Sequence, residues 1–161
     1  DSLEAVDMAS PGLEFLEGTY FWEGNPRYAQ ANQSAYDKAY RQAVGVDDNG
    51  ASISDARDVS TYAHMFGCWE TLHIIKAGME ASSYRGPADR TGLIEAVEAM
   101  TTMPHSHAHP QGDKVFNGRT HQVFGHQYIS KVENSRLVLT HTTSIEDTIY
   151  PDEVDYTTQS F

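Results

Sequence analysis

The segment that most constrains the fold is residues 59–81, with the sequence VSTYAHMFGCWETLHIIKAGMEA. Apolar and aromatic residues recur in it at spacings of three and four, which predicts one long helix. Asp58 and Ser60, at the start of this segment, are suitable N-cap residues. Because the helix is apolar on nearly all sides, we expect neighbouring elements on several of its faces.

Large apolar side chains of this helix are expected to form the core, since burying them is the main stabilising term in folding. Cys68 lies within the same apolar pattern, and we interpret it as an inert, buried thiol. It is the single cysteine of the chain, which excludes an internal disulfide. The residues expected to be largely buried are Phe66, Trp69, Leu72 and Ile75.

Two further segments have helical periodicity. Ala31, Ala35 and Ala39 recur every four residues within 25–44, with tyrosines nearby, and Gly45 is a suitable helix terminator. The segment 90–100 has a narrower apolar stripe, and Asp89 precedes it as a candidate cap. With the long helix, these segments predict three successive helices in the middle of the chain.

Strands are expected near both ends of the chain. Residues 18–23 are rich in aromatics, whereas residues 126–132 and 136–144 alternate or are rich in β-branched residues and predict a hairpin. Between the helices and this hairpin, residues 103–122 are rich in Gly, Asn, Pro and His and predict a loop. The acidic tail, residues 146–161, is expected to be extended.

This order of elements predicts an α/β fold with central helices, an early strand and a C-terminal β-hairpin. Such a set of strands cannot cover both faces of the helices, so we interpret the chain as part of a larger structure. Its 161 residues are the usual size of one domain, and no linker or repeat divides them. We find no secretory signal, and we interpret the chain as a mature protein or a piece of a longer one.

Composition excludes some classes of partner. The formal charge is −12, from 11 basic and 23 acidic residues, which argues against binding to nucleic acid or to an anionic membrane surface. Hydrophobic residues make up 39% of the chain, enough for a packed core. No apolar run approaches the roughly 18 residues that a membrane-spanning helix needs.

The stretch MPHSHAHPQGD places three histidines two residues apart, at His105, His107 and His109. In an extended chain their imidazoles would share one side and could bind Zn²⁺ or Ni²⁺ with one further donor. Pro104 and Pro110 bracket the run, so we interpret it instead as a solvated surface loop without a functional metal. The further donors considered are His121, His126 and Asp113.

Other catalytic chemistry is not indicated. The chain has no nucleophile-elbow G-x-S-x-G, no phosphate-binding G-x-x-x-x-G-K, no C-x-x-C and no H-E-x-x-H. No pair of carboxylates stands out from the acidic surface. We therefore expect a protein that is not an enzyme and needs no cofactor.

Four segments together resemble, in order and spacing, the C-terminal half of a type I periplasmic solute-binding protein of an ABC importer. The third resembles the family helix written aYdav..la.Al..Ag, and the fourth contains the PQG of the amide and urea branch with a histidine further along. The segments are LEGTYFWEGNP, NQSAYDKAYRQAVG, TYAHMFGCWETLHIIKAG and HPQGDKVFNGRTHQVFGHQYISKVENSRLVL.

The resemblance implies a Rossmann-like, two-lobed receptor of which residues 1–161 are one C-terminal portion. Residues 25–103 would belong to the helical part of lobe I, and residues 13–24 and 123–145 to strands near the hinge and lobe II. The implied function is periplasmic: binding a branched-chain amino acid, a short amide or urea between the lobes and delivering it to a membrane permease. Implied partners are that permease and the missing N-terminal lobe or a second copy of the chain.

The resemblance also implies which residues face the ligand. The hinge strand would contribute Tyr20 and Trp22, and the start of the long helix would contribute Tyr62 and His64. Tyr62 offers both a ring and a hydroxyl group, which suits a cleft that binds small polar molecules. His64 departs from the family pattern, because a tyrosine usually stands at that position.

Three alternatives remain open at this stage. A cytoplasmic amide sensor on the same fold would control gene expression through a partner protein, and only the precursor sequence separates it from an exported receptor. A metal-dependent hydrolase would use the histidine-rich stretch and would lose activity on chelation. A fragment with a purely structural or interaction role would bind no solute of its own.

Overall fold

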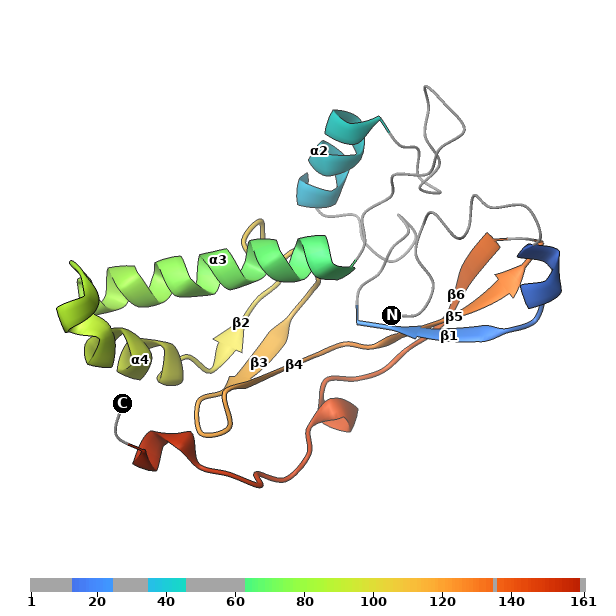
Figure 1. Cartoon of the computed structure of the whole chain (residues 1–161). Coiled ribbons are helices and arrows are strands. Elements are labelled where there is room, and N and C mark those ends of the chain that lie inside the picture. Colours follow the sequence, from blue (N-terminus) through green and yellow to red (C-terminus); the bar gives the residue numbers. More distant parts are fainter. Residues whose placement is uncertain (1–12, 25–34, 46–62, 135, 160–161) are drawn as a thin grey trace.

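The computed structural model describes residues 13–24, 35–45, 63–134 and 136–159 (Figure 1). Its helices are α2 (Ala35–Val44), α3 (Ala63–Ser82) and α4 (Arg90–Glu98), with 3-10 turns η1 (Leu13–Leu16), η2 (Pro87–Asp89), η3 (Glu146–Thr148) and η4 (Tyr156–Thr158). Its strands are β1 (Tyr20–Glu23), β2 (Thr102–Met103), β3 (Lys114–Asn117), β4 (Gln122–Gly125), β5 (Tyr128–Glu133) and β6 (Arg136–Thr142).

The described strands form two three-stranded sheets, in the orders β1-β5-β6 and β2-β3-β4, and all their pairings are antiparallel. The expected mixture of central helices with strands near both ends is confirmed in that coarse form. The described part is of the α+β type, with helices beside antiparallel sheets, rather than the α/β type expected.

The expected hairpin is present as β5 and β6, with the predicted alternation of faces. Tyr128, Ser130 and Val132 are buried, because they share the inner face of a strand whose side chains alternate. The expectation of a loop over residues 103–122 is wrong in part, since β3 and the start of β4 lie within it. These strands are short, and their pairing with each other stabilises them more than local propensity does.

Two bodies are joined by stretches of chain that pass from one sheet to the other (Figure 1). In one body, α3 and α4 lie against the sheet of β2, β3 and β4; the other is the sheet of β1, β5 and β6. The chain crosses through His126 and Gln127 between β4 and β5, and crosses back after β6, where Tyr150 packs edge-on against Phe124 at 5.1 Å.

The two crossings are bonded to each other. The backbone N–H of Thr143 donates to the carbonyl of Gln127 at 2.8 Å, and the N–H of Gln127 donates to the Thr143 hydroxyl at 2.9 Å. Nδ1 of His126 lies 2.8 Å from the Thr143 carbonyl. These bonds fix the direction in which the chain leaves one body and enters the other.

Helix α3 confirms part of the expected core and corrects the rest. Phe66 is fully buried, as predicted, and Trp69 is half-buried. The expectation is wrong for Leu72 and Ile75, which are 65% and 43% exposed, and for Cys68, which is exposed. Periodicity shows that a helix is apolar on several sides, but it does not tell which of those sides this part of the chain covers.

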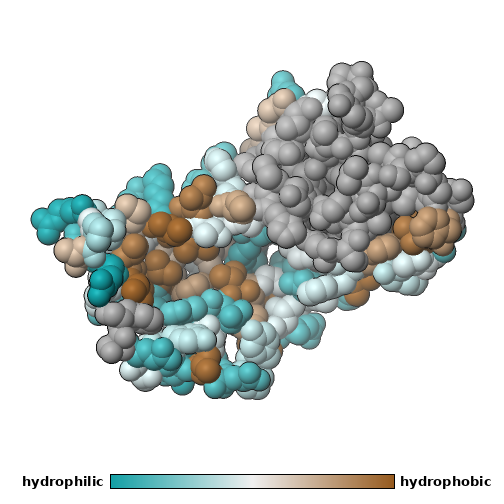
Figure 2. Space-filling view, in the orientation of Figure 1, coloured by the Kyte–Doolittle hydropathy of each residue, from teal (hydrophilic) through white to brown (hydrophobic). Residues whose placement is uncertain are grey.

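The exposed apolar residues form one stripe along α3. Cys68, Leu72, Ile75 and Met79 are spaced four, three and four residues apart, so they lie on one face of the helix. Hydrophobic side chains gather over α3 in the space-filling view (Figure 2). None of the described helices combines the length and apolar character that crossing a membrane requires.

Candidate functional site

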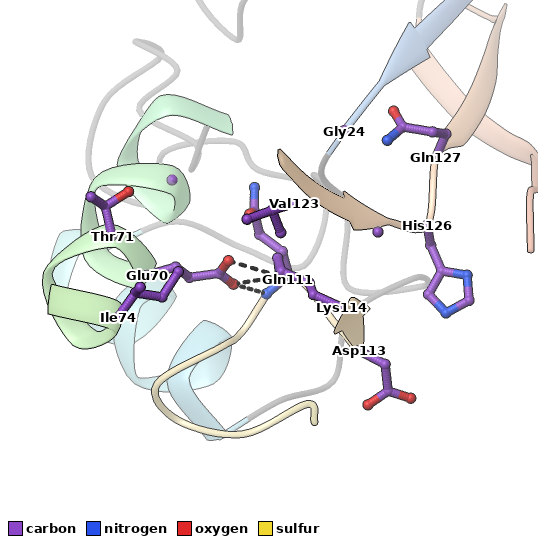
Figure 3. Close-up of a pocket in the computed structure, with 12 residues that line it drawn as sticks. Gly24, Glu70, Thr71, Ile74, Gln111, Asp113, Lys114, Val123, His126 and Gln127 are labelled. Atoms are coloured by element: carbon purple, nitrogen blue, oxygen red, sulfur yellow. Dashed lines mark hydrogen bonds and ion pairs between the residues drawn. The ribbon is translucent and has the colours of Figure 1, made fainter. Parts of the chain in front are cut away.

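A cavity of about 250 Å³ lies between α3, the β3–β4 hairpin and the crossing between the two sheets (Figure 3). Glu70, Thr71 and Ile74 come from α3, whereas Gly24, His126 and Gln127 come from the crossing side. The other lining residues are Gly67, Gln111, Asp113, Lys114, Val123 and Gly125.

A buried ion pair forms one wall of this cavity. Glu70 lies on the inner face of α3, one helical turn after Phe66, and only 3% of it is exposed. Nζ of Lys114, the first residue of β3, lies 2.7 Å and 3.0 Å from the two carboxylate oxygens of Glu70. This contact joins helix α3 to a strand far along the sequence.

Burial controls the ionisation of this pair. Loss of solvation raises the pKa of Glu70 above its usual value, and the charge of Lys114 opposes that change. Loss of solvation likewise lowers the pKa of Lys114, and Glu70 opposes that change. Both pKa changes have the same cause: the free energy lost when each charge leaves water exceeds the free energy gained from its attraction to the partner.

The PQG segment is fixed by the same carboxylate. The backbone N–H of Gln111 donates to Glu70 at 2.7 Å, and the carbonyl of Gln111 accepts from the Tyr128 hydroxyl at 3.3 Å. Gly112 has a φ of 117°, a conformation that L side chains rarely adopt, and its carbonyl accepts from Lys114 at 3.2 Å. The segment is therefore a built loop and not a random surface connection.

On the crossing side, two polar groups have unused capacity. Oε1 of Gln127 is buried and has no hydrogen-bond partner among the described residues. Nδ1 of His126 donates to the Thr143 carbonyl, since a carbonyl can only accept, which makes Nε2 an acceptor in the neutral ring. A buried acceptor without a hydrogen-bond partner lowers the stability of the fold, so a role in binding a ligand would explain why it is present.

The residues predicted from the hinge strand lie elsewhere. Tyr20 and Trp22 are each 62% exposed on one face of β1, where Lys131 lies 5.9 Å from the Tyr20 ring centre. Neither is among the described residues that line the cavity, although Gly24, just beyond β1, is. His64 lies in the first turn of α3, and Tyr62 lies outside the described residues.

The histidine-rich stretch packs on α3 instead of extending. Ser106 and His109 bond to each other's backbone at 3.3 Å and 3.2 Å, which closes a turn, and the His107 carbonyl accepts from the Trp69 indole at 2.8 Å. The predicted loop is thus confirmed, but His105, His107 and His109 do not alternate along an extended chain. No group of three metal-binding side chains suited to an ion occurs in the part of the chain that the structure describes.

The cavity residues Glu70, Lys114 and Gln127 were not predicted from the sequence. One signal was available: Glu70 is a carboxylate in the middle of an apolar helix, next to the residues expected to be buried. A charge at such a position is retained only with a partner. The partner, Lys114, carries no comparable signal because it lies in a segment interpreted as a loop.

Comparison with known proteins assigns the chain to no group: no protein-family model matches it, and no curated protein matches it.

Proposed function

We propose that the chain is the C-terminal part of the solute-binding component of an ABC importer, which binds a small polar molecule between two lobes and delivers it to a membrane permease. The observation that carries the proposal is the position of the cavity. It lies where the chain crosses between two bodies and takes residues from both sides of that crossing. Ligands preferentially occupy such junctions, and closure about a crossing couples binding to a change of shape.

The stripe on α3 supports the proposal that a further lobe packs here. Cys68, Leu72, Ile75 and Met79 expose an apolar face that water does not favour. A Rossmann-like lobe needs a parallel sheet. Because the described strands pair only antiparallel, such a sheet would have to come from outside the described residues. We propose that the N-terminal half implied by the resemblance, or a second copy of the chain, covers this stripe.

The roles of the resemblance-derived residues are part of the same proposal. Tyr62 and His64 would approach the ligand from the start of α3, and Tyr20 and Trp22 from the hinge strand. Alanine at Tyr62 in the complete receptor should weaken binding. Unchanged affinity together with unchanged stability would remove Tyr62 from the site.

The direct test is calorimetric titration of the chain with branched-chain amino acids, short amides and urea. We expect a single-site isotherm for at least one class of solute, weakened at least fivefold by Gln127→Met, which keeps the side-chain volume but removes the amide. Asp89→Asn is the matched control, because Asp89 accepts from the Arg85 backbone before α4 and does not line the cavity. Absence of binding across the panel, by this chain and by the complete two-lobed receptor, would contradict the proposed function.

A further inference from the structure

We propose that the cavity prefers a small organic cation with several N–H donors and a short alkyl chain, such as an alkylguanidinium or an alkylamidinium, over a neutral solute of the same shape. This inference rests on the proposed binding of a small polar molecule and adds organic cations to the solute classes to be tested. It is carried by the hydrogen-bonding character, the charge and the shape of the described lining.

The polar groups with unused capacity at the crossing side are acceptors. Among the described residues, Oε1 of Gln127 is buried without a partner, and Nε2 of His126 is an acceptor when the ring carries its one proton on Nδ1. Asp113 is exposed and accepts the His105 backbone N–H through one carboxylate oxygen at 2.7 Å; no hydrogen bond from a described residue engages the second oxygen. A ligand that satisfies these groups must bring N–H donors to them.

The ammonium group in the lining is already engaged. Lys114 donates to both oxygens of Glu70 and to the carbonyl of Gly112, so little of its donor capacity is left for an anionic ligand. An anion would have to displace Glu70 from a buried ion pair. That displacement would leave one carboxylate without its counter-charge in a desolvated site.

Charge favours a cation over a neutral molecule. The lining contains the carboxylates of Glu70 and Asp113 and one ammonium, that of Lys114, which leaves one negative charge in excess. A proton transferred within the buried pair does not change this excess. The whole chain carries a formal net charge of −12, so its long-range electrostatic field also attracts cations.

Apolar and polar side chains both contribute to the lining. Ile74 and Thr71 lie on the Glu70 side, and Gln127 lies across from them, while Asp113 and His126 lie on the side of Lys114 away from Glu70 (Figure 3). With Val123, Ile74 offers apolar surface to an alkyl chain. The volume of about 250 Å³ corresponds to roughly eight water-sized groups.

The experiment compares n-butylguanidinium with n-butylurea, which have nearly the same shape. The guanidinium is a cation with five N–H donors, whereas the urea is neutral, with three N–H donors and a carbonyl acceptor. Each is titrated calorimetrically into the 161-residue chain at about 150 mM salt, where long-range attraction is largely screened. We expect n-butylguanidinium to bind at least tenfold more tightly. Asp113→Asn should reduce that ratio at least fivefold, whereas Asp89→Asn should leave it unchanged.

Each other outcome overturns the inference in a distinguishable way. If n-butylurea binds as tightly or more tightly, the charge preference is wrong and the proposed function stands. If both bind but neither Asp113→Asn nor Gln127→Met affects them, the site lies outside the cavity. If neither binds, the inference is wrong, and the wider solute panel then decides the proposed function. Because the ligand pair is compared on the native chain, a variant that fails to fold does not obscure the result.

Discussion

Removing the charge of Glu70 should destabilise the fold strongly, because Lys114 would stay buried without a counter-charge. In the substitution Glu70→Gln, an amide replaces the carboxylate that lies 2.7 Å and 3.0 Å from Nζ of Lys114, whose residue is only 8% exposed. Breaking a buried pair from one side costs about 3–5 kcal/mol. At the lower end, the melting temperature of a chain of this size falls by roughly 6–12 °C.

The assay is thermal and urea unfolding of the native chain and of the variant near neutral pH. Glu80→Gln is the matched control, because it is the same substitution in the same helix. Glu80 pairs with Lys76 at 3.8 Å, with both side chains about two-thirds exposed, and the control should cost less than about 1 kcal/mol. Replacing both buried partners, Glu70→Leu with Lys114→Met, should recover only part of the loss, because the Gln111 N–H then loses its acceptor.

The pH dependence provides an independent check. The folded-state pKa of Lys114 is depressed. Its contribution to stability is therefore present at a pH above the pKa of the unfolded state, and it is lost as the pH falls through the pKa of the folded state. The pKa of Glu70 is raised, so its contribution is present at low pH and is lost as the pH rises through the folded value. The deficit of Glu70→Gln should therefore be greatest between the two folded-state pKa values and smaller on either side.

Two results would refute this reasoning. One is a Glu70→Gln variant that unfolds within about 1 kcal/mol of Glu80→Gln, which would mean that water reaches Lys114. The other is a deficit that does not change between acidic and alkaline conditions, which would mean that neither charge is desolvated.

Further predictions concern backbone packing, thiol exposure, association and metal. A Cβ at Gly118 would lie 1.9 Å from the Glu98 carbonyl oxygen, so Gly118→Ala should lower the free energy of unfolding by several kcal/mol. A Cβ at Gly67 would meet open space, so Gly67→Ala should raise the free energy of unfolding by about 1 kcal/mol. Urea unfolding of the two variants measures both effects. Cys68 should react with a thiol reagent at the rate of an exposed cysteine before unfolding. Leu72→Lys should reduce self-association in sedimentation without lowering the melting temperature by more than about 4 °C. Chelation should leave the melting temperature within about 2 °C, because a structural ion would contribute several kcal/mol.

Elements with strong periodicity could be predicted from the sequence. The predicted start of the long helix, Val59, lies outside the described residues, but α3 ends at Ser82, within one residue of the expected end, and β5 alternates as expected. Phe66 is fully buried, whereas Leu72 on the same helix is 65% exposed. An apolar pattern alone does not distinguish a helix face that packs within the chain from a face that would pack against another lobe or another chain.

The candidate site could be predicted only in part. The segment HPQGD was identified through the resemblance, and it does line the cavity through Gln111 and Asp113. Lys114 and Gln127 could not be found, because their roles depend on contacts across the fold rather than on local spacing. Gln127 becomes notable only when its amide oxygen is seen to be buried without a partner.

The central claim is that a small solute binds in this cavity, and heteronuclear NMR titration of the isotope-labelled chain tests it most directly. With n-butylguanidinium, the largest saturable shift changes should fall on the side-chain amide of Gln127 and on the backbone amides of Asp113 and Thr71. The stretch from Gly118 to Thr120 should stay unshifted as an internal reference. Shift changes confined to residues outside the cavity, or no saturable change at any residue up to millimolar ligand, would contradict the account.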